Sequence, residues 1–289
     1  MTTTKTRRSV LGAALAGAAA AAIGIGLAAP AQAQDTLERL REQGFARIAI
    51  ANEPPWTQVN ADGTVTGAAP EVAAAVLARL GVEEVIASIS EYGAMIPGLQ
   101  ARRFDLVTAG LFIKPERCEA VIFSEPDLCD AEAFAVATGN PLGIASYADL
   151  GAHEEVVVGA PGGGTEERLA LEAGVPRDRV VVVPDAQSGV VMLQDGRIDV
   201  YALPLLSLIS LLDTAEDPNL ELVGPLADTP VYCAGAAFHP EDTAFRDAYD
   251  AELAALKESG EFAAIIEPFG FNAEAASMTT REEQCGEPN

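Results

Sequence analysis

The sequence predicts an α/β protein of two lobes, joined by two hinge segments, with a ligand cleft between the lobes. Predicted strands alternate with predicted helices along the chain, which is typical of a mainly parallel sheet. The order of elements in the first half is repeated in the second, and two short sequence patterns recur at corresponding places. Small-molecule sites prefer a cleft of this kind, and hinge motion is the expected way of closing it.

In the first half, residues that favour turns and helix ends separate the predicted elements. The Asp62-Gly63 pair is a hairpin turn signal. The helix predicted over 70–80 has Pro70 in its first turn and Gly81 after its end. Apolar runs predict the other elements of this half, which are strands over 46–51, 85–89 and 104–107 and a helix over 95–102.

The second half has the same order of elements. The predicted elements are strands over 156–159, 180–183 and 198–202, helices over 165–173 and 188–194, and closing helices over 244–259 and 262–267. The segment from Gly98 to Asp105 is echoed by the segment from Met192 to Asp199, because each ends a helix and starts a strand with Arg-x-Asp. This echo supports two lobes of similar construction.

A second echo predicts where the lobes are joined. The segment 126–134 resembles the segment 230–238, and each lies after a complete set of alternating elements. We interpret the two as hinge segments. One lobe is therefore predicted from residues 34–130 together with 235–289, and the other from residues 131–234.

The composition excludes several classes of protein. The chain has 289 residues, with 43 Asp+Glu against 18 Lys+Arg, a formal charge of −25 and a pI near 4.2. This argues against a nucleic-acid partner, because phosphate contacts need clustered Lys and Arg. An apolar content of 49% is globular rather than disordered. The two histidines lie far apart and near no Cys pair, so we expect no metal site.

Residues 1–33 are typical of a signal peptide. Arg7-Arg8 precedes an uncharged apolar run over 10–29, and Ala31-Gln32-Ala33 is a small-x-small cleavage pattern. The paired arginines indicate twin-arginine export. The alternative is a single transmembrane anchor, which the Ala/Gly-rich run and the cleavage pattern disfavour. The first cysteine is Cys118, so no lipid anchor is expected. We expect cleavage near Ala33 and release into the periplasm, where an outer membrane would retain the product.

Several motifs of the mature chain resemble the solute-binding proteins of polar amino-acid ABC importers. After the export signal come the Gly-Leu-Gln-x-x-Arg-Phe-Asp motif over 98–105, Lys-Pro-Glu-Arg over 114–117 and Phe-Ser-Glu-Pro over 123–126. The motifs over 52–56, 91–93 and 109–118 are most similar to the ectoine/hydroxyectoine-binding branch of that family. The resemblance covers essentially all of the mature chain.

This resemblance implies a fold and a function. The fold is the type II periplasmic-binding-protein fold. The implied function is a receptor without enzymatic activity or cofactor, which delivers a compatible solute, ectoine or hydroxyectoine, to the transmembrane subunits of an ABC permease. Monomers are usual for this fold, so we expect a monomer.

The resemblance also assigns the ligand's two charges. Arg117 is implied to hold the ligand carboxylate, which a guanidinium can bind with two parallel hydrogen bonds. Its alternative role is a surface ion pair with Glu116 or Glu119. Glu53 is implied to pair with the cyclic amidinium, because a carboxylate can neutralise a desolvated cation. Its alternative is a solvent-facing loop position in a very acidic chain.

Three aromatic residues are implied to form a cage for the cation. Trp56, Tyr92 and Phe112 each lie in a loop that follows a predicted strand, and such loops line the cleft in open α/β sheets. Aromatic faces attract delocalised cations. The alternative is ordinary core packing. Amino-acid binders usually carry Ser or Thr at the position of Phe112, and an Asp that holds the α-ammonium at the position of Pro204.

The second lobe is expected to supply Gly164 and Thr165 to the ligand carboxylate. The Gly-rich segment 161–165 lies between a predicted strand and helix, where glycine admits a ligand close to the backbone and the helix start offers N–H groups. Thr165 is predicted as the N-cap. Plain capping without ligand contact is the alternative. No Gly-Lys-Ser/Thr follows, so a P-loop is excluded.

The four cysteines allow three pairings, and an oxidising compartment favours disulfides. Cys129 and Cys233 hold equivalent places in the two hinge segments, which should run side by side. This favours Cys129–Cys233 and leaves Cys118–Cys285. Buried free thiols are the alternative.

Three other functions compete with a receptor for ectoine. An ordinary polar amino-acid receptor has the same fold, but Phe112 and Pro204 argue against it. Periplasmic dehydratases of arogenate or prephenate also share the fold, and Glu53 could serve one as an acid or base. No Ser/His or Cys/His pair is readable, so no catalytic residue is predicted. A sensor ectodomain is disfavoured because no later apolar run, including 200–212, reaches the roughly 20 residues of a membrane span.

Overall fold

The computed structural model of the protein describes residues 36–286. These residues belong to one compact unit, Gln34–Asn289. The predicted signal peptide, residues 1–33, lies outside the described part. Within residues 36–286, none of the helices combines the length and the apolar composition that a membrane crossing requires.

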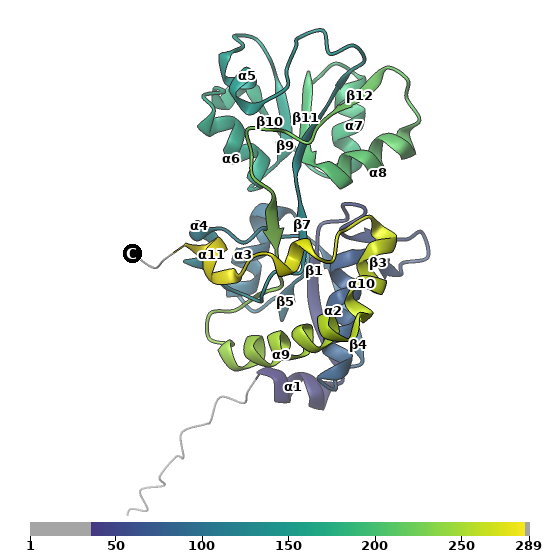
Figure 1. The fold of residues 1–289 in the computed structure, drawn as a ribbon, viewed down its shortest axis with the longest axis vertical. Helices are drawn as coiled ribbons and strands as arrows, with labels where there is room; N and C mark the ends of the chain where they lie inside the picture. The colour runs from purple at the N-terminus through teal and green to yellow at the C-terminus, as the bar shows by residue number, and fades with distance from the viewer. Residues whose placement is uncertain (1–35, 287–289) are drawn as a thin grey trace, which may run out of the picture. The chain divides into compact units, whose positions relative to one another are not determined.

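A five-stranded sheet forms the centre of the first lobe (Figure 1). Its strands, in spatial order, are β4 (Glu84–Ile89), β1 (Phe45–Ile50), β5 (Leu106–Val107), β14 (Ala237–Phe238) and β6 (Ile122–Phe123). β1 pairs in parallel with β4 and β5, whereas β14 runs antiparallel to β5 and β6. The helices of this lobe are α1 (Thr36–Gln43), α2 (Ala68–Arg79), α3 (Tyr92–Gln100), α4 (Pro115–Cys118), α9 (Thr243–Ser259), α10 (Glu261–Ile266) and α11 (Arg281–Cys285).

A second five-stranded sheet forms the centre of the second lobe. Its strands, in spatial order, are β10 (Val180–Val183), β9 (Val158–Pro161), β11 (Val200–Pro204), β8 (Glu132–Ala137) and β12 (Leu220–Val223). β10, β9 and β11 are parallel, and β8 is antiparallel to both of its neighbours. The helices of this lobe are α5 (Tyr147–Ala152), α6 (Thr165–Glu172), α7 (Ala186–Gln194) and α8 (Leu205–Ala215). Both sheets are therefore mixed, with two parallel and two antiparallel pairings each, whereas the sequence predicts mainly parallel sheets.

The hinge segments form a small sheet of their own. β7 (Leu128–Asp130) pairs antiparallel with β13 (Tyr232–Ala234), and Cys129 lies directly opposite Cys233. The two cysteines are disulfide-bonded, and a second disulfide joins Cys118 of α4 to Cys285 of α11. Both pairings are those that the sequence favours. The predicted lobe boundaries fall directly after β7 and directly after β13.

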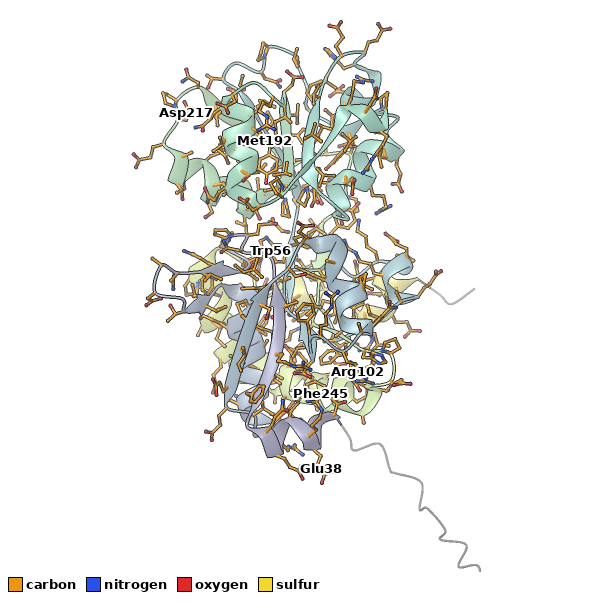
Figure 2. The ribbon with its side chains drawn as sticks, turned by 180° about the vertical axis from the view of Figure 1, so that it is seen from behind. Glu38, Trp56, Arg102, Met192, Asp217 and Phe245 are labelled. Carbon is orange, nitrogen blue, oxygen red and sulfur yellow. A yellow bond between two sulfur atoms is a disulfide. The ribbon has the colours of Figure 1, made fainter. Side chains whose placement is uncertain are left out.

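Each lobe buries its own apolar core. Phe245 belongs to the core of the first lobe and Met192 to that of the second (Figure 2). Alternate residues of β8 point to opposite faces of the second sheet. Phe134 therefore packs in the cluster with Tyr147, whereas Ala133 packs in the cluster with Met192.

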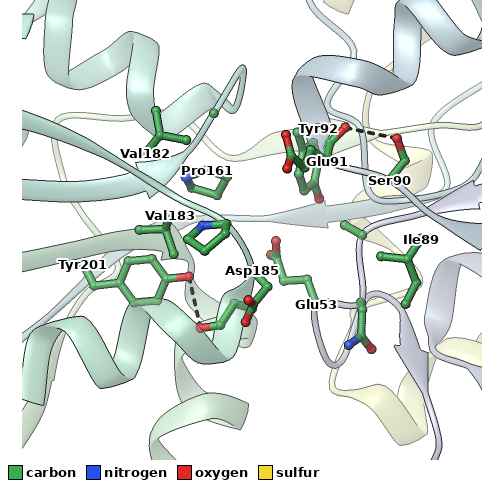
Figure 3. A pocket seen from close by; sticks show the side chains of 15 residues that line it. Glu53, Ile89, Ser90, Glu91, Tyr92, Pro161, Val182, Val183, Asp185 and Tyr201 are labelled. Carbon is green, nitrogen blue, oxygen red and sulfur yellow. Dashed lines mark hydrogen bonds between the residues drawn. The ribbon is translucent and has the colours of Figure 1, made fainter.

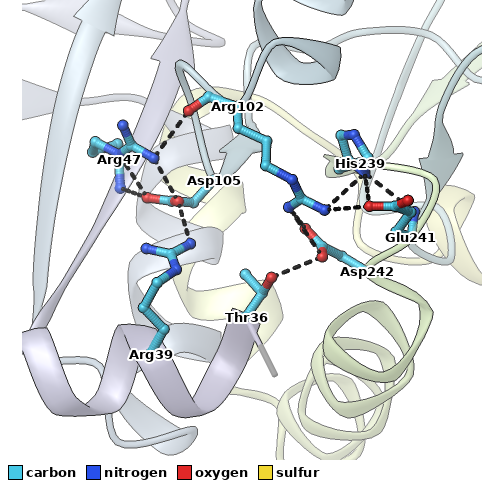
Figure 4. Close-up of polar contacts among 8 residues, drawn as sticks. All are labelled: Thr36, Arg39, Arg47, Arg102, Asp105, His239, Glu241 and Asp242. Carbon is cyan, nitrogen blue, oxygen red and sulfur yellow. Dashed lines mark hydrogen bonds and ion pairs between the residues drawn. The ribbon is translucent and has the colours of Figure 1, made fainter. Parts of the chain in front are cut away.

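An ion-pair network ties the first helix to the base of the first lobe (Figure 4). Asp105 accepts hydrogen bonds from Arg39 at 2.8 Å and from the Arg47 guanidinium at 2.9 and 3.1 Å. The backbone N–H of Arg47 adds another at 2.8 Å. Asp242 accepts from Thr36 at 2.7 Å and from Arg102 at 3.1 Å. These contacts join segments that are far apart in the sequence.

Most predicted elements are present, with shifted ends. The hairpin turn at Asp62-Gly63 joins β2 (Gln58–Val59) to β3 (Val65–Thr66). The strands predicted over 156–159 and 198–202 each lie two residues later, as β9 and β11. The apolar run 200–212 is a strand followed by a helix, with Pro204 at the junction. Short 3-10 helices occur at Arg177–Arg179, Glu267–Phe269 and Ala275–Ser277.

Candidate functional site

A small cavity lies between the two lobes. Its lining residues are Glu53, Tyr92, Gly110, Phe112, Arg117, Pro161, Gly164, Thr165, Glu166 and Pro204. Six of the seven residues that the sequence predicts for the ligand site are among them, together with Pro204. The seventh, Trp56, does not line this cavity.

Arg117 is the cation of the cavity. It lies in the short helix α4 and is 9% exposed. Its guanidinium donates to the Phe112 carbonyl at 2.9 Å and to the Gly163 carbonyl at 3.1 Å, so both lobes orient it. No ion pair with Glu116 or Glu119 is formed in the described structure, because Glu116 pairs with Arg168 at 3.2 Å instead. Burial lowers the pKa of Arg117, as expected of a cation short of a counter-ion.

Glu53 contributes a carboxyl group to the same cavity. It follows β1 and is 3% exposed. Its backbone is fixed by Thr57, whose hydroxyl accepts from Glu53 N at 3.2 Å and whose N–H donates to Glu53 O at 2.9 Å. Oε1 accepts a hydrogen bond from the Ser207 hydroxyl at 2.6 Å. Burial raises the pKa of Glu53 to about 8, although the Ser207 hydrogen bond opposes this shift.

The aromatic residues form a wall of two layers. Phe112 lines the cavity, and Trp56 packs edge-on against it with ring centroids 5.6 Å apart. Trp56 is 1% exposed and also packs edge-on against Phe271 at 4.7 Å. Gly110 lines the cavity in front of the indole, and a Cβ at Gly110 would lie 2.4 Å from that ring. The close approach therefore requires glycine, and Trp56 supports the wall from behind.

Tyr92 and Tyr232 complete the aromatic surroundings. The Tyr92 hydroxyl donates to the Ala109 carbonyl at 2.7 Å, which fixes this cavity residue to the first lobe. Tyr232 packs against Phe112 with centroids 5.4 Å apart. The Lys114 ammonium lies 3.8 Å from the centroid of the Tyr232 ring. Tyr232 was not predicted, because it lies in a hinge strand that its sequence marks only as extended.

The second lobe presents a helix start to the cavity. Gly164 is the N-cap of α6 and Thr165 is its first helical residue, so the prediction of Thr165 as N-cap is wrong by one position. Gly164 can accept this role because its backbone is held by a hydrogen bond from its N–H to Pro161 O at 3.0 Å. Thr165 is 3% exposed, and its hydroxyl has no hydrogen-bond partner within residues 36–286. Its hydroxyl is thus available to a ligand oxygen.

Three charged residues near the cavity escaped the sequence analysis. Glu166 lines the cavity, and burial raises its pKa. Glu132 is fully buried opposite Pro204 in the sheet, and neither of its carboxylate oxygens has a hydrogen-bond partner in the described part of the chain. Burial lowers the pKa of Lys114 to about 8. Nothing in the sequence distinguishes these charges from solvated ones, because strand register decides the burial of Glu132 and tertiary packing decides that of Glu166 and Lys114.

Direct contacts close the lobes around the cavity. Gly93 N donates to Gly162 O at 3.0 Å. A Cβ at Gly163 would lie 2.7 Å from Gly93 Cα, so this contact also depends on glycine. The Arg168–Glu116 ion pair and the Arg117 bond to Gly163 O cross the same interface. The cavity is thus shaped by residues from both sides.

A wider groove of about 540 Å³ adjoins the cavity. Figure 3 shows Glu53 and Tyr92 on one wall of the groove and Pro161 and Tyr201 on the opposite wall. Glu53, Tyr92 and Pro161 also line the smaller cavity. The groove therefore borders the cavity on the side of Glu53.

Two α/β lobes, joined by paired hinge strands around an enclosed polar and aromatic cavity, define the type II solute-binding fold. The chain belongs to the bacterial extracellular solute-binding proteins, family 3, whose sequence model matches residues 46–272. The resemblance to solute-binding proteins inferred from the sequence is thereby confirmed.

Individual relatives agree with this family. A crystal structure of EhuB in complex with hydroxyectoine is 66% identical to the chain, with a TM-score of 0.87 over 88% of this chain and 100% of the other. A probable amino-acid ABC transporter periplasmic-binding protein, y4tE of Sinorhizobium fredii, is 31% identical over 86% of this chain and 85% of the relative. The ancestral amino acid-binding protein AncCDT-1, a precursor of cyclohexadienyl dehydratase, is 24% identical with a TM-score of 0.71 over 81% of this chain and 99% of the other, which shows the fold alone.

Proposed function

We propose that the protein is the extracytoplasmic receptor of an ABC importer, that it binds ectoine or hydroxyectoine, and that it delivers this compatible solute to the permease. The observation that carries the proposal is the placement of a buried guanidinium and a buried carboxylate in one aromatic-walled cavity. Ectoines carry a carboxylate and a cyclic amidinium on one small ring. Arg117 would take the carboxylate, and Glu53 would face the amidinium.

The other walls of the cavity suit the same ligand. Phe112 and Tyr92 offer aromatic surface to a delocalised cation, a contact worth about 0.5–2 kcal/mol each. Trp56 would contribute by holding Phe112 in place. Gly164 and Thr165 would add donors for the carboxylate from the second lobe. The similarity to EhuB, which was crystallised with hydroxyectoine, supports this assignment.

An amino-acid receptor is the main alternative, because the relative y4tE is described as a probable amino-acid binder. An α-ammonium is strongly hydrated and needs several directional acceptors. Phe112 has no hydroxyl, and Pro204 lines the cavity where amino-acid binders carry an Asp. Leaving a buried ammonium short of acceptors would cost about 1–3 kcal/mol or more.

A dehydratase is the remote alternative, since AncCDT-1 shares the fold. Glu53 and Glu166 line the cavity with raised pKa values, and either could serve as an acid or base. The cavity's other features serve charge recognition, and we therefore infer a receptor that is not an enzyme. A test for turnover of prephenate and arogenate would show no product above background.

Calorimetric titration with ectoine, hydroxyectoine, glycine betaine, arginine, glutamine and glutamate tests the function. The proposal expects ectoine or hydroxyectoine to bind at least about tenfold more tightly than any of the others, which corresponds to about 1.4 kcal/mol. Equal or tighter binding of an amino acid would replace the proposal with the amino-acid receptor.

The remaining parts of the proposal concern location and assembly. We propose export to the periplasm with cleavage near Ala33, and a monomeric mature protein. Intact-mass analysis of exported protein tests the cleavage, and light scattering tests the monomer. Retention of residues 1–33 in the exported protein would contradict the cleavage.

A further inference from the structure

Glu53 and Ser207 form a hydrogen bond between the two lobes. Glu53 follows β1 of the first lobe, and Ser207 is the third residue of α8 in the second. The Ser207 hydroxyl donates to Glu53 Oε1 at 2.6 Å, and the two residues are 0% and 3% exposed respectively. A contact that short to a carboxylate is in the range of charge-assisted hydrogen bonds.

The start of α8 is anchored beside the hinge, and this anchoring fixes the position of Ser207. Leu205 N donates to Ala131 O at 2.8 Å, and Leu206 N donates to Asp130 Oδ2 at 2.9 Å. The Leu206 side chain packs against the apolar core of the first lobe. The Glu53–Ser207 hydrogen bond is therefore one of the contacts that join the two lobes beside the hinge.

The hydrogen bond engages one of the two carboxylate oxygens. Ser207 occupies Oε1, whereas Oε2 is the oxygen on which a ligand cation could be bound. The carboxylate belongs to the lining of the cavity, but Ser207 does not. Ser207 therefore acts on the ligand only through Glu53.

We propose that Ser207 is a positioning residue, which holds the Glu53 carboxylate in place for the ligand cation when the two lobes are closed. The second lobe thereby takes part in recognition of the ligand cation, because Ser207 contacts Glu53 when the lobes are closed. This inference rests on the proposed function, because it assumes a ligand with a delocalised cation. It assigns a role to a residue that is neither in the cavity nor predicted from the sequence.

Several titratable groups face Glu53, and they affect how its ionisation responds to pH. They are Glu166 of α6, Asp130 of β7, Glu132 of β8, Tyr92 of α3 and Tyr201 of β11. The charges of Glu166 and Asp130 oppose ionisation of Glu53, whereas the Ser207 hydroxyl favours the ionised form. The two tyrosines are uncharged in this pH range, because burial raises their pKa values. Without that hydroxyl, Glu53 should ionise at higher pH.

The experiment compares Ser207→Ala and Ser207→Thr with Ser210→Ala, which changes a serine one turn further along α8. Trp56 is the only tryptophan and packs against Phe112, so its fluorescence can follow titration with ectoine and hydroxyectoine. Ser207→Ala should weaken binding by about ten- to a hundredfold, the usual effect of losing a hydrogen bond to a charged group. Ser207→Thr should restore much of the affinity, and Ser210→Ala should bind like the unmutated protein.

Two further readouts separate positioning from general support of the fold. The affinity of the unmutated protein should rise with pH around 8 as Glu53 ionises, and Ser207→Ala should move this rise to higher pH. Lys114 titrates in the same range, so Glu53→Gln serves as the background that lacks the Glu53 contribution. In a double-mutant cycle, Ser207→Ala should cause little further loss once Glu53→Gln is present.

The outcomes distinguish this inference from the function on which it rests. If the unmutated protein binds neither ectoine nor hydroxyectoine, the proposed function fails. If it binds one of them and Ser207→Ala leaves both the affinity and its pH dependence unchanged, only the role of Ser207 is overturned. An equal loss from Ser207→Ala with and without Glu53→Gln would also overturn it. That cycle decides the matter even if the extra methyl of Ser207→Thr disturbs packing.

Discussion

Asp105 and Glu53 are two buried carboxylates of the first lobe, each 3% exposed, and they differ in their partners. Asp105 accepts four hydrogen bonds, three from the guanidinium groups of Arg39 and Arg47 and one from the Arg47 backbone N–H (Figure 4). Burial alone would raise its pKa, but these bonds outweigh burial and hold the pKa below its ordinary value. Glu53 accepts one hydrogen bond at its carboxylate, from Ser207, and burial raises its pKa to about 8.

The difference separates a carboxylate that holds the fold from one that we propose serves the ligand. A buried charge is tolerated when partners replace its hydration. Asp105 has those partners in the protein itself. Glu53 would obtain its main partner from the ligand, as would Arg117, which has two carbonyls and no carboxylate bonded to it. Glu53 and Arg117 therefore lack counter-ions in the cavity, and the bound ligand should supply them.

The largest effect on binding is expected from Arg117→Ala. The ligand carboxylate would be buried without its charged partner, at a cost of roughly 2–5 kcal/mol of binding free energy. Stability should change little, because Arg117 has no ion-pair partner to leave behind. Calorimetric titration measures the loss, with the exposed Arg103→Ala as the matched control. Unchanged affinity for ectoine and hydroxyectoine would remove Arg117 from the site.

Asp105→Ala should have the opposite effects to Arg117→Ala, since it should reduce stability and leave ligand affinity unchanged. The variant would leave two arginines without their counter-ion and should lower the free energy of unfolding by about 3 kcal/mol. Ligand affinity should be unchanged wherever the variant is folded, because the network lies at the base of the lobe. Urea denaturation measures the loss, and Asp213→Ala, which removes an exposed carboxylate, is the control. A variant as stable as the unmutated protein would show that the network contributes little.

Selectivity should respond to Phe112→Ser combined with Pro204→Asp. These changes supply the acceptors that an α-ammonium needs, so the preference for ectoines over open-chain amino acids should narrow by about ten- to a hundredfold. The measurement is the ratio of affinities for ectoine and glutamine in both proteins. An unchanged ratio would mean that the two positions do not determine ligand class.

The last prediction concerns how the stability of the protein without ligand depends on pH. Burial raises the pKa of Glu53 to about 8 and those of Asp127 and Asp130 to about 7. Between about pH 5 and 7 the folded state then binds more protons than the unfolded state, so stability should fall as pH rises, by on the order of 1 kcal/mol per pH unit for each of the three groups. Denaturation in urea at pH 5.5 and 7 tests this. Stability that rises with pH over this interval would contradict it.

Much of the fold could be predicted from the sequence, because repeated local patterns carry it. Alternating strands and helices, the turn at Asp62-Gly63 and the echo of the hinge segments all follow from short-range features. The pairing of Cys129 with Cys233 was favoured for the same reason. Helix α8 was not predicted, because its apolar residues continue from β11 without a polar break.

The candidate site could be predicted only where a residue type reveals its role. Arg117, Phe112 and Glu53 stand in motifs that resemble a known family. Glu132 and Ser207 do not, because register and lobe closure bring them to their places. Trp56 was expected to face the ligand, and the structure places it behind Gly110 and Phe112. A loop sequence cannot distinguish these two layers of one wall.

Glu53→Gln tests most directly whether the buried charge of Glu53, which lacks a counter-ion in the protein, serves ligand binding. The amide keeps an oxygen for Ser207 but removes the buried charge. At pH 8, without ligand, the variant should be more stable than the unmutated protein by on the order of 1 kcal/mol or more. The same variant should bind ectoine or hydroxyectoine about tenfold or more weakly. A variant that is less stable, as Asp105→Ala should be, or one that binds as tightly as the unmutated protein, would contradict the account.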